Sequence, residues 1–60
     1  MAKILVADVS SFVRVKLVSI LQTAGHEVIE TVDGTTVLKW AIAEQPDVIM
    51  LDLMMPGADG

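Results

Sequence analysis

Three short runs rich in apolar or β-branched residues alternate with two longer stretches in which apolar residues recur at helical spacing, along this chain of 60 residues. The first run, residues 4–7, and the third, residues 48–51, contain no polar residue, which is typical of parallel strands covered on both faces. The second run, residues 27–32, mixes β-branched with charged residues, as expected at the edge of a sheet. The pattern predicts three strands, with the first in the centre.

A helix is predicted after the first strand, because Ser10 or Ser11 can cap its first turn and Gly25 can end it in left-handed geometry. The helix runs for about 14 residues, and apolar side chains at helical spacing form its inward stripe: Val13, Leu17, Ile20, Leu21 and Ala24. Val15 and Val18 fall on an adjoining face, where they are either incidental surface residues or a second docking surface.

A second helix is predicted over about residues 35–45, because Asp33 can cap its start and Pro46 prevents its continuation. The inward positions of this helix are Val37, Leu38 and Ala41. Trp40 flanks them and is interpreted as a half-buried packing residue rather than a recognition anchor. His26 is expected in the solvated turn before the second strand, without a role.

The order of elements is therefore β-α-β-α-β, and the right-handedness of crossovers restricts how the strands can lie. If the first crossover leads outward from the first strand and the second returns past it, the strand order is 2-1-3. The two helices then cover opposite faces of a parallel sheet. The sequence predicts an α/β fold that is half of a doubly wound sheet, with a switch point between strands one and three.

Both fully apolar runs end on a carboxylate, Asp8 after the first and Asp52 after the third. In the order 2-1-3, the two carboxylates should lie side by side at the carboxyl edge of the sheet. Neighbouring carboxylates repel each other unless one is protonated or a cation lies between them. Magnesium fits this arrangement, because it takes one or two carboxylates with waters and an available carbonyl oxygen. The alternative is that Asp52 only caps the turn that follows.

The composition narrows the possible classes of protein. A chain of 60 residues forms at most one small domain and buries only about 60% of its unfolded surface. It has no cysteine, and its single histidine cannot build a histidine cluster, so neither a disulfide nor a thiolate metal site is expected. The chain is nevertheless 53% hydrophobic with a mean hydropathy of +0.65, and this surplus of apolar surface suggests a missing partner.

Charge and segment length argue against several partners. A net charge of −4 with four scattered basic residues argues against nucleic acid. The apolar segments are too short to span a bilayer, and Asp8 interrupts the first one, so neither a membrane span nor a signal peptide is expected and the location is predicted to be cytoplasmic. Residues 7–12 contain no glycine that would let the backbone approach the phosphates of a nucleotide.

Five segments together form a recognisable pattern: residues 3–8 (KILVAD), 10–14 (SSFVR), 24–28 (AGHEV), 33–34 (DG) and 46–60 (PDVIMLDLMMPGADG). The pattern resembles the receiver domain of two-component response regulators, of the single-domain chemotaxis type. The resemblance implies a flavodoxin-like fold in which Asp52 accepts a phosphoryl group from a histidine kinase. It also implies that Asp8 holds magnesium through water and that the backbone carbonyl of Met54 binds the metal directly. A signalling module, not an enzyme, is therefore predicted.

Two departures from the family pattern put the site in doubt. Receivers usually carry two consecutive acidic residues after the first strand, the second being the direct metal ligand, but Val9 stands at that position. Receivers are also longer than 60 residues, and their second half supplies the hydroxyl and the lysine that hold the phosphoryl oxygens. The chain is thus interpreted as one truncated receiver domain over residues 1–60, with weak or absent magnesium and Asp52 vestigial. The alternative is a functional receiver that accepts phosphate and binds magnesium. An aspartyl phosphatase is disfavoured, because it usually needs a second Asp at position 54, which is Met.

Apolar residues at unusual positions predict self-association. Val9, Val15 and Val18 stand where receivers usually carry polar side chains. Residues 48–51 would form an unprotected apolar edge in the order 2-1-3, and such an edge pairs readily with another chain. A homodimer or higher homo-oligomer is predicted, closed by a two-fold axis, with the third strands meeting or with two halves imitating one whole receiver.

Overall fold

The computed structural model describes residues 1–52 of the chain, and the sequence-based predictions on residues 53–60 lie outside this part. Its elements, in chain order, are β1 (Lys3–Ala7), α1 (Ser11–Thr23), β2 (Glu27–Thr31), the 3₁₀ turn η1 (Gly34–Thr36), α2 (Val37–Glu44) and β3 (Val48–Leu51). The predicted order of strands and helices is confirmed, with boundaries that differ by one or two residues.

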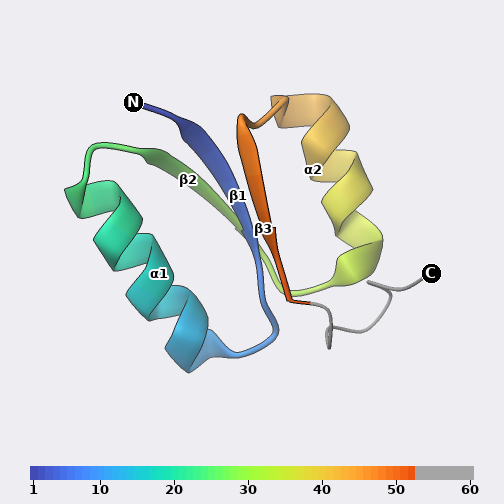
Figure 1. Ribbon diagram of the computed structural model, residues 1–60. Helices are drawn as coiled ribbons and strands as arrows, with labels where there is room; N and C mark the ends of the chain where they lie inside the picture. Colours follow the sequence, from blue (N-terminus) through green and yellow to red (C-terminus); the bar gives the residue numbers. More distant parts are fainter. Residues whose placement is uncertain (53–60) are drawn as a thin grey trace.

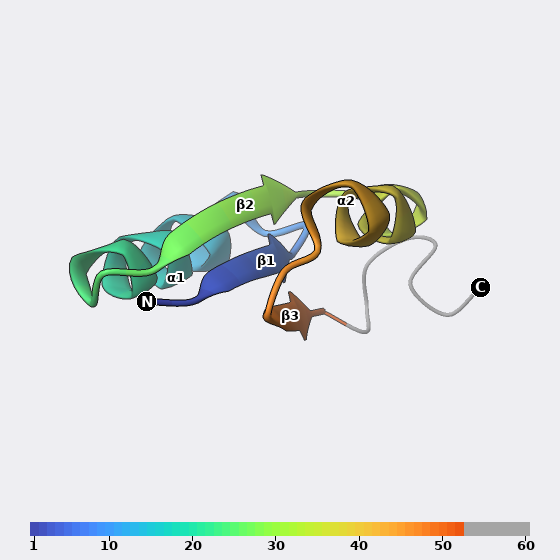
Figure 2. The same cartoon turned by 90° about the horizontal axis from the view of Figure 1, so that it is seen from above.

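The three strands form a parallel sheet in the order β2-β1-β3. Figure 1 shows α1 on one side of this sheet and α2 on the other, and Figure 2 shows β1 between the two outer strands. The arrangement is that of half a doubly wound, flavodoxin-like fold, as the sequence predicted. All three strands therefore end at the same edge of the sheet, which is where ligands bind in such folds.

The core is the central strand. Ile4, Leu5, Val6 and Ala7 are at most 5% exposed, because β1 has a strand on each edge and a helix on each face. β3 was expected to be covered on both faces, and within the described residues this prediction is wrong. Three of its four side chains are 39–47% exposed. The reason is its place in the sheet, since β1 pairs with one of its edges and α2 packs mainly against β1.

Helix α1 begins and ends as predicted but is rotated from the predicted orientation. The Ser10 hydroxyl accepts a hydrogen bond from the Val13 N–H at 3.3 Å, and Gly25 after the helix has a φ of 92°. The half-buried side chains of α1 are Arg14, Leu17, Val18 and Leu21. Val13 and Ile20 are 41% and 65% exposed and Ala24 is exposed as well, so three members of the predicted inward stripe are not buried against the sheet.

Helix α2 follows the turn η1, whose last two residues, Thr35 and Thr36, were expected to be helical. Asp33 caps this turn, since its carboxylate accepts a hydrogen bond from the Thr35 N–H at 2.9 Å. Trp40 is half-buried, as predicted, whereas Leu38 is 69% exposed and not inward. Gln45 takes a left-handed conformation, with a φ of 47°, and ends the helix before the proline.

His26 has a structural role that the sequence interpretation missed. Its Nδ1 accepts a hydrogen bond from the Ala2 N–H at 3.0 Å, and the side chain is half-buried. The adjacent Glu27 N–H donates to the Ala2 carbonyl at 2.9 Å. The imidazole thus attaches the residue before β1 to the residue before β2, and the expectation of a solvated turn without a role is wrong.

Within residues 1–52, no helix is both long enough and apolar enough to cross a bilayer.

Burial of β1 predicts where stability is concentrated. Leu5→Ala should lower the free energy of unfolding by about 2–5 kcal/mol, because it removes fully buried apolar atoms and leaves a cavity. Leu38→Ala is the matched control, and its 69% exposed side chain should change stability by no more than about 0.5 kcal/mol. Urea denaturation at one chain concentration measures both. Similar losses in the two variants would contradict the burial pattern.

Candidate functional site

Asp8 and Asp52 follow β1 and β3 at the same edge of the sheet. The register pairs Ala7 with Leu51, and its continuation by one residue sets Asp8 beside Asp52. Backbone hydrogen bonds hold both positions. The Asp52 N–H donates to the Ala7 carbonyl at 2.9 Å, and the Asp8 N–H donates to the Thr31 carbonyl at 3.1 Å. The two carboxylates thus belong to neighbouring backbone positions across the gap between β1 and β3.

A cavity of about 200 Å³ lies at this edge, and both aspartates line it. The rest of its lining is apolar: Val6, Ala7, Leu17, Met50 and Leu51. Both carboxylates are half-buried. An apolar wall strengthens the interactions of charged groups relative to bulk water, so the cavity favours a cation near the two carboxylates.

The loop between β1 and α1 is held by short local hydrogen bonds. One carboxylate oxygen of Asp8 accepts from the Ser10 N–H at 2.8 Å, which leaves the second oxygen for other contacts. The Ser10 carbonyl accepts from the Arg14 N–H at 2.9 Å and starts the helical ladder. Val9, between these residues, is 52% exposed and is not part of the cavity lining.

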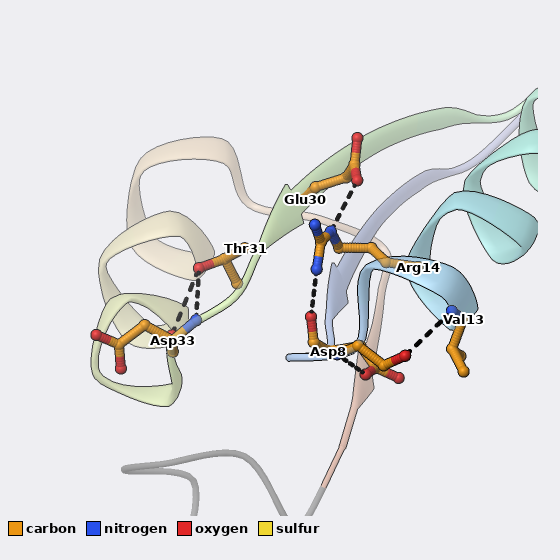
Figure 3. A network of polar contacts seen from close by, with 7 residues as sticks. Asp8, Val13, Arg14, Glu30, Thr31 and Asp33 are labelled. Carbon is orange, nitrogen blue, oxygen red and sulfur yellow. Dashed lines mark hydrogen bonds and ion pairs between the residues drawn. The ribbon is translucent and has the colours of Figure 1, made fainter.

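Arg14 is a residue of this region whose part the sequence interpretation missed. Its guanidinium donates from Nη1 to the Asp8 carbonyl at 2.8 Å and from Nε to a carboxylate oxygen of Glu30 at 3.1 Å (Figure 3). The side chain of Arg14 is only 16% exposed. A signal existed in the sequence, because Arg14 precedes Leu17, Val18 and Leu21 at helical spacing and is the charged member of that face.

At the end of β2, the hydroxyl groups of Thr31 and Thr36 form a further set of hydrogen bonds, close to the backbone contact of Thr31 with Asp8. Thr31 is 8% exposed and hydrogen-bonds to the hydroxyl of Thr36. The Thr36 hydroxyl also donates to the Asp33 carbonyl at 2.8 Å. These contacts fix the strand whose carbonyl accepts the Asp8 N–H, so the position of Asp8 depends on β2 as well as on β1.

The donor groups of residues 1–52 fit magnesium only loosely. No group of three or more acidic, histidine or cysteine side chains in this part of the chain could enclose a metal ion. Asp8 and Asp52 would be the protein ligands, with waters completing the octahedron that magnesium requires. Val9 offers no ligand atom, and Met54, whose carbonyl the resemblance implicated, lies outside the described residues.

Comparisons with known proteins agree with this architecture. Residues 4–60 match the family described as the response regulator receiver domain. The protein PilH of Pseudomonas aeruginosa is 38% identical over 60 residues, which are the whole of this chain and 50% of PilH. The response regulator PleD of Caulobacter vibrioides is 45% identical over 60 residues, covering 98% of this chain and 13% of PleD. A protein-glutamate methylesterase/protein-glutamine glutaminase of Archaeoglobus fulgidus is 42% identical over 59 residues, covering 97% and 17%. No solved structure matches the chain significantly.

The chain belongs to the response regulator receiver family, and the resemblance to receiver domains stated from the sequence is confirmed, whereas its assignment to the single-domain chemotaxis type stays a prediction. It spans half the length of PilH and a smaller share of the other two relatives. Receiver domains are signalling modules of two-component systems. The methylesterase shows that a similar segment also occurs within a longer protein named for an enzymatic activity.

Val9→Asp is expected to raise the affinity for magnesium and to lower stability without the metal. The new carboxylate would join two others, and three negative charges near one another disfavour the folded state until a cation binds. Thermal unfolding with increasing magnesium measures both effects, and stabilisation should reach about 2.7 kcal/mol at a hundred times the dissociation constant. Val9→Asn is the neutral control of similar shape. Equal stabilisation of the original chain and of Val9→Asp would contradict a site assembled around Asp8 and Asp52.

Proposed function

We propose that this chain is a phosphoryl-accepting unit of a two-component receiver, with Asp52 as the acceptor position, and that its site is weak or inactive. The proposal is supported by one observation above all, the position of Asp52 next to Asp8 at the carboxyl edge of a receiver-type sheet. The donor would be a histidine kinase, the location would be the cytoplasm, and residues 1–60 would act as one structural unit.

The reaction would use few protein groups. A carboxylate oxygen of Asp52 forms a bond to phosphorus while the bond between phosphorus and the donor breaks, and the donor keeps the electron pair of that bond. Catalysis of phosphoryl transfer consists mainly of positioning and of stabilising charge on the transferring group. Magnesium, when bound, would supply the positive charge. Asp8 would orient its waters, and the missing carboxylate at position 9 makes this assistance weak.

A functional phosphoryl-accepting receiver that binds magnesium is the second candidate. It is favoured by the cavity, in which both carboxylates are half-buried against apolar side chains. The two candidates share the acceptor residue and differ in rate.

Phosphorylation of the 60-residue chain separates the two candidates. With acetyl phosphate and magnesium, the chain should gain little or no hydroxylamine-labile mass adduct, because preorganised charge stabilisation is often the largest catalytic contribution and is mostly missing here. Val9→Asp should gain more adduct than the original chain, and Asp52→Asn should gain none. An adduct on Asp52 at a rate typical of receivers would establish the second candidate.

We propose further that the 60-residue chain associates with itself through β3. Val48, Ile49 and Leu51 are 47%, 44% and 39% exposed, so much of their apolar surface is open to a partner. No strand of residues 1–52 pairs with the outer edge of β3. Other large apolar side chains on the helices are exposed as well, Phe12 and Ile20 on α1 and Ile42 on α2.

The backbone of β3 shows which edge a second copy would meet. The N–H groups of a strand alternate between its two neighbours. Because the Asp52 N–H donates to the Ala7 carbonyl, Met50 directs its N–H toward β1, while Ile49 and Leu51 direct theirs to the outer edge. A two-fold pairing of outer edges would satisfy these donors and bury more than about 1,000 Å² in total.

Two proline variants test the association. Ile49→Pro should weaken the dimer while the monomer keeps its sheet, because proline is tolerated where the lost N–H faces an open edge. Met50→Pro should reduce both association and folding, because it removes a donor to β1. Sedimentation at micromolar concentration gives the mass, and circular dichroism gives the fold. A monomeric original chain whose unfolding midpoint does not move with concentration would refute self-association.

A further inference from the structure

We propose that Arg14 is a positioning residue of the acidic site, which fixes the Asp8–Val9 peptide and so directs the Asp8 carboxylate and the side chain at position 9. Glu30 holds Arg14 in place. The consequence for metal binding rests on the function proposed above, whereas the positioning itself does not.

The geometry connects three elements through one side chain. Arg14 lies in the first turn of α1, its Nη1 donates to the Asp8 carbonyl at the end of β1, and its Nε contacts Glu30 on β2 (Figure 3). The planar guanidinium presents its donors in a fixed arrangement, so the two contacts together restrict the direction of the side chain. With an exposed fraction of 16%, Arg14 has little freedom to move elsewhere.

The Asp8 carbonyl needs a partner at this point of the chain. The Asp8 N–H, directly after β1, donates to the Thr31 carbonyl of β2, and the paired register ends at Ala7 with Thr31. The carbonyl of Asp8 therefore lies beyond the paired part of the sheet. The Arg14 guanidinium donates to it in place of a backbone N–H from a neighbouring strand. Rotation about the Cα–C bond of Asp8 would break this contact and would turn the N–H of Val9 with it.

The conformation of the Asp8 backbone also determines the orientation of the Asp8 carboxylate. The turn from Asp8 to Ser10 is closed by the hydrogen bond from the Ser10 N–H to one Asp8 carboxylate oxygen at 2.8 Å. This bond forms only when the backbone between the two residues has the observed conformation. Loss of the Arg14 contact should loosen the turn, and the carboxylate of Asp8, one of the residues that line the cavity, would then no longer be held in a fixed direction.

Charge alone would predict the opposite effect on metal binding. An arginine beside a carboxylate pair repels a cation, so its removal would raise magnesium affinity if charge were its main contribution. Removal of a partner that orients a ligand lowers affinity instead. Stability is a poor measure here, because an ion pair with a 46% exposed carboxylate contributes little. The sign of the change in affinity therefore distinguishes positioning from charge.

Amide hydrogen exchange tests positioning without a metal. In Arg14→Met, the Ser10 amide should exchange about tenfold faster while the amides of β1 keep their rates, because only the turn opens. Lys16→Met is the matched control. It removes one positive charge from the same helix, and the Lys16 ammonium lies over the Phe12 ring, 4.7 Å from its centroid. Unchanged Ser10 exchange in Arg14→Met would overturn the proposal.

Glu30→Gln keeps the inference testable if Arg14→Met unfolds. It preserves the shape of the partner and removes its charge, so Ser10 exchange should be faster than in the original chain and than in Lys16→Met. A Ser10 amide that exchanges in Glu30→Gln as in the original chain would overturn the role given to Glu30.

Magnesium titration tests whether Arg14 affects metal binding at the acidic site. In the Val9→Asp background, Arg14→Met should weaken magnesium binding by about tenfold or more, as for other partners that orient metal ligands. Lys16→Met should leave it the same or slightly tighter. Tighter binding after Arg14→Met would show a charge effect and overturn the metal consequence. If Val9→Asp itself binds no magnesium, the proposed function fails, and the amide exchange still decides whether Arg14 positions the turn.

Discussion

The central position of β1 is the constraint on which the other features of this fold depend. Its backbone pairs with β2 on one edge and with β3 on the other, and its side chains from Ile4 to Ala7 are at most 5% exposed. In the described residues these four side chains form the buried apolar core. Both outer strands pair with β1 and both helices contact it, so the most deeply buried apolar surface of this small chain lies in one strand.

The same constraint produces the acidic site. Because β1 and β3 are parallel and paired up to Ala7 and Leu51, the residues that follow them meet at one edge. Asp8 and Asp52 are thus brought to neighbouring positions by backbone hydrogen bonding between the strands. Arg14 and Ser10 then determine how the Asp8 turn is held. The chemistry of the site depends on backbone geometry that lies outside its acidic residues.

The exposed surface of β3 connects the fold with the function of the family. An apolar strand with exposed side chains at the edge of a sheet pairs readily with a further strand, which could come from additional receiver structure or from another copy. Either arrangement would satisfy the outward backbone groups of β3. A surface of this kind is therefore compatible with a receiver that belongs to a longer protein and with an associating 60-residue chain.

Local signals in the sequence were sufficient for the element order, the strand order, the Ser10 cap of α1 and the placement of Asp8 and Asp52 at one edge. Each of these depends on neighbouring residues or on the handedness of crossovers, which apply to any chain with this pattern. The tertiary structure alone decided the inward face of α1, the exposure of β3, the contact of His26 with Ala2 and the position of Arg14. These features depend on which surfaces a sheet of three strands offers to the helices and loops. Helical spacing shows which side chains share one face of a helix, but it does not show how wide the sheet is that covers this face.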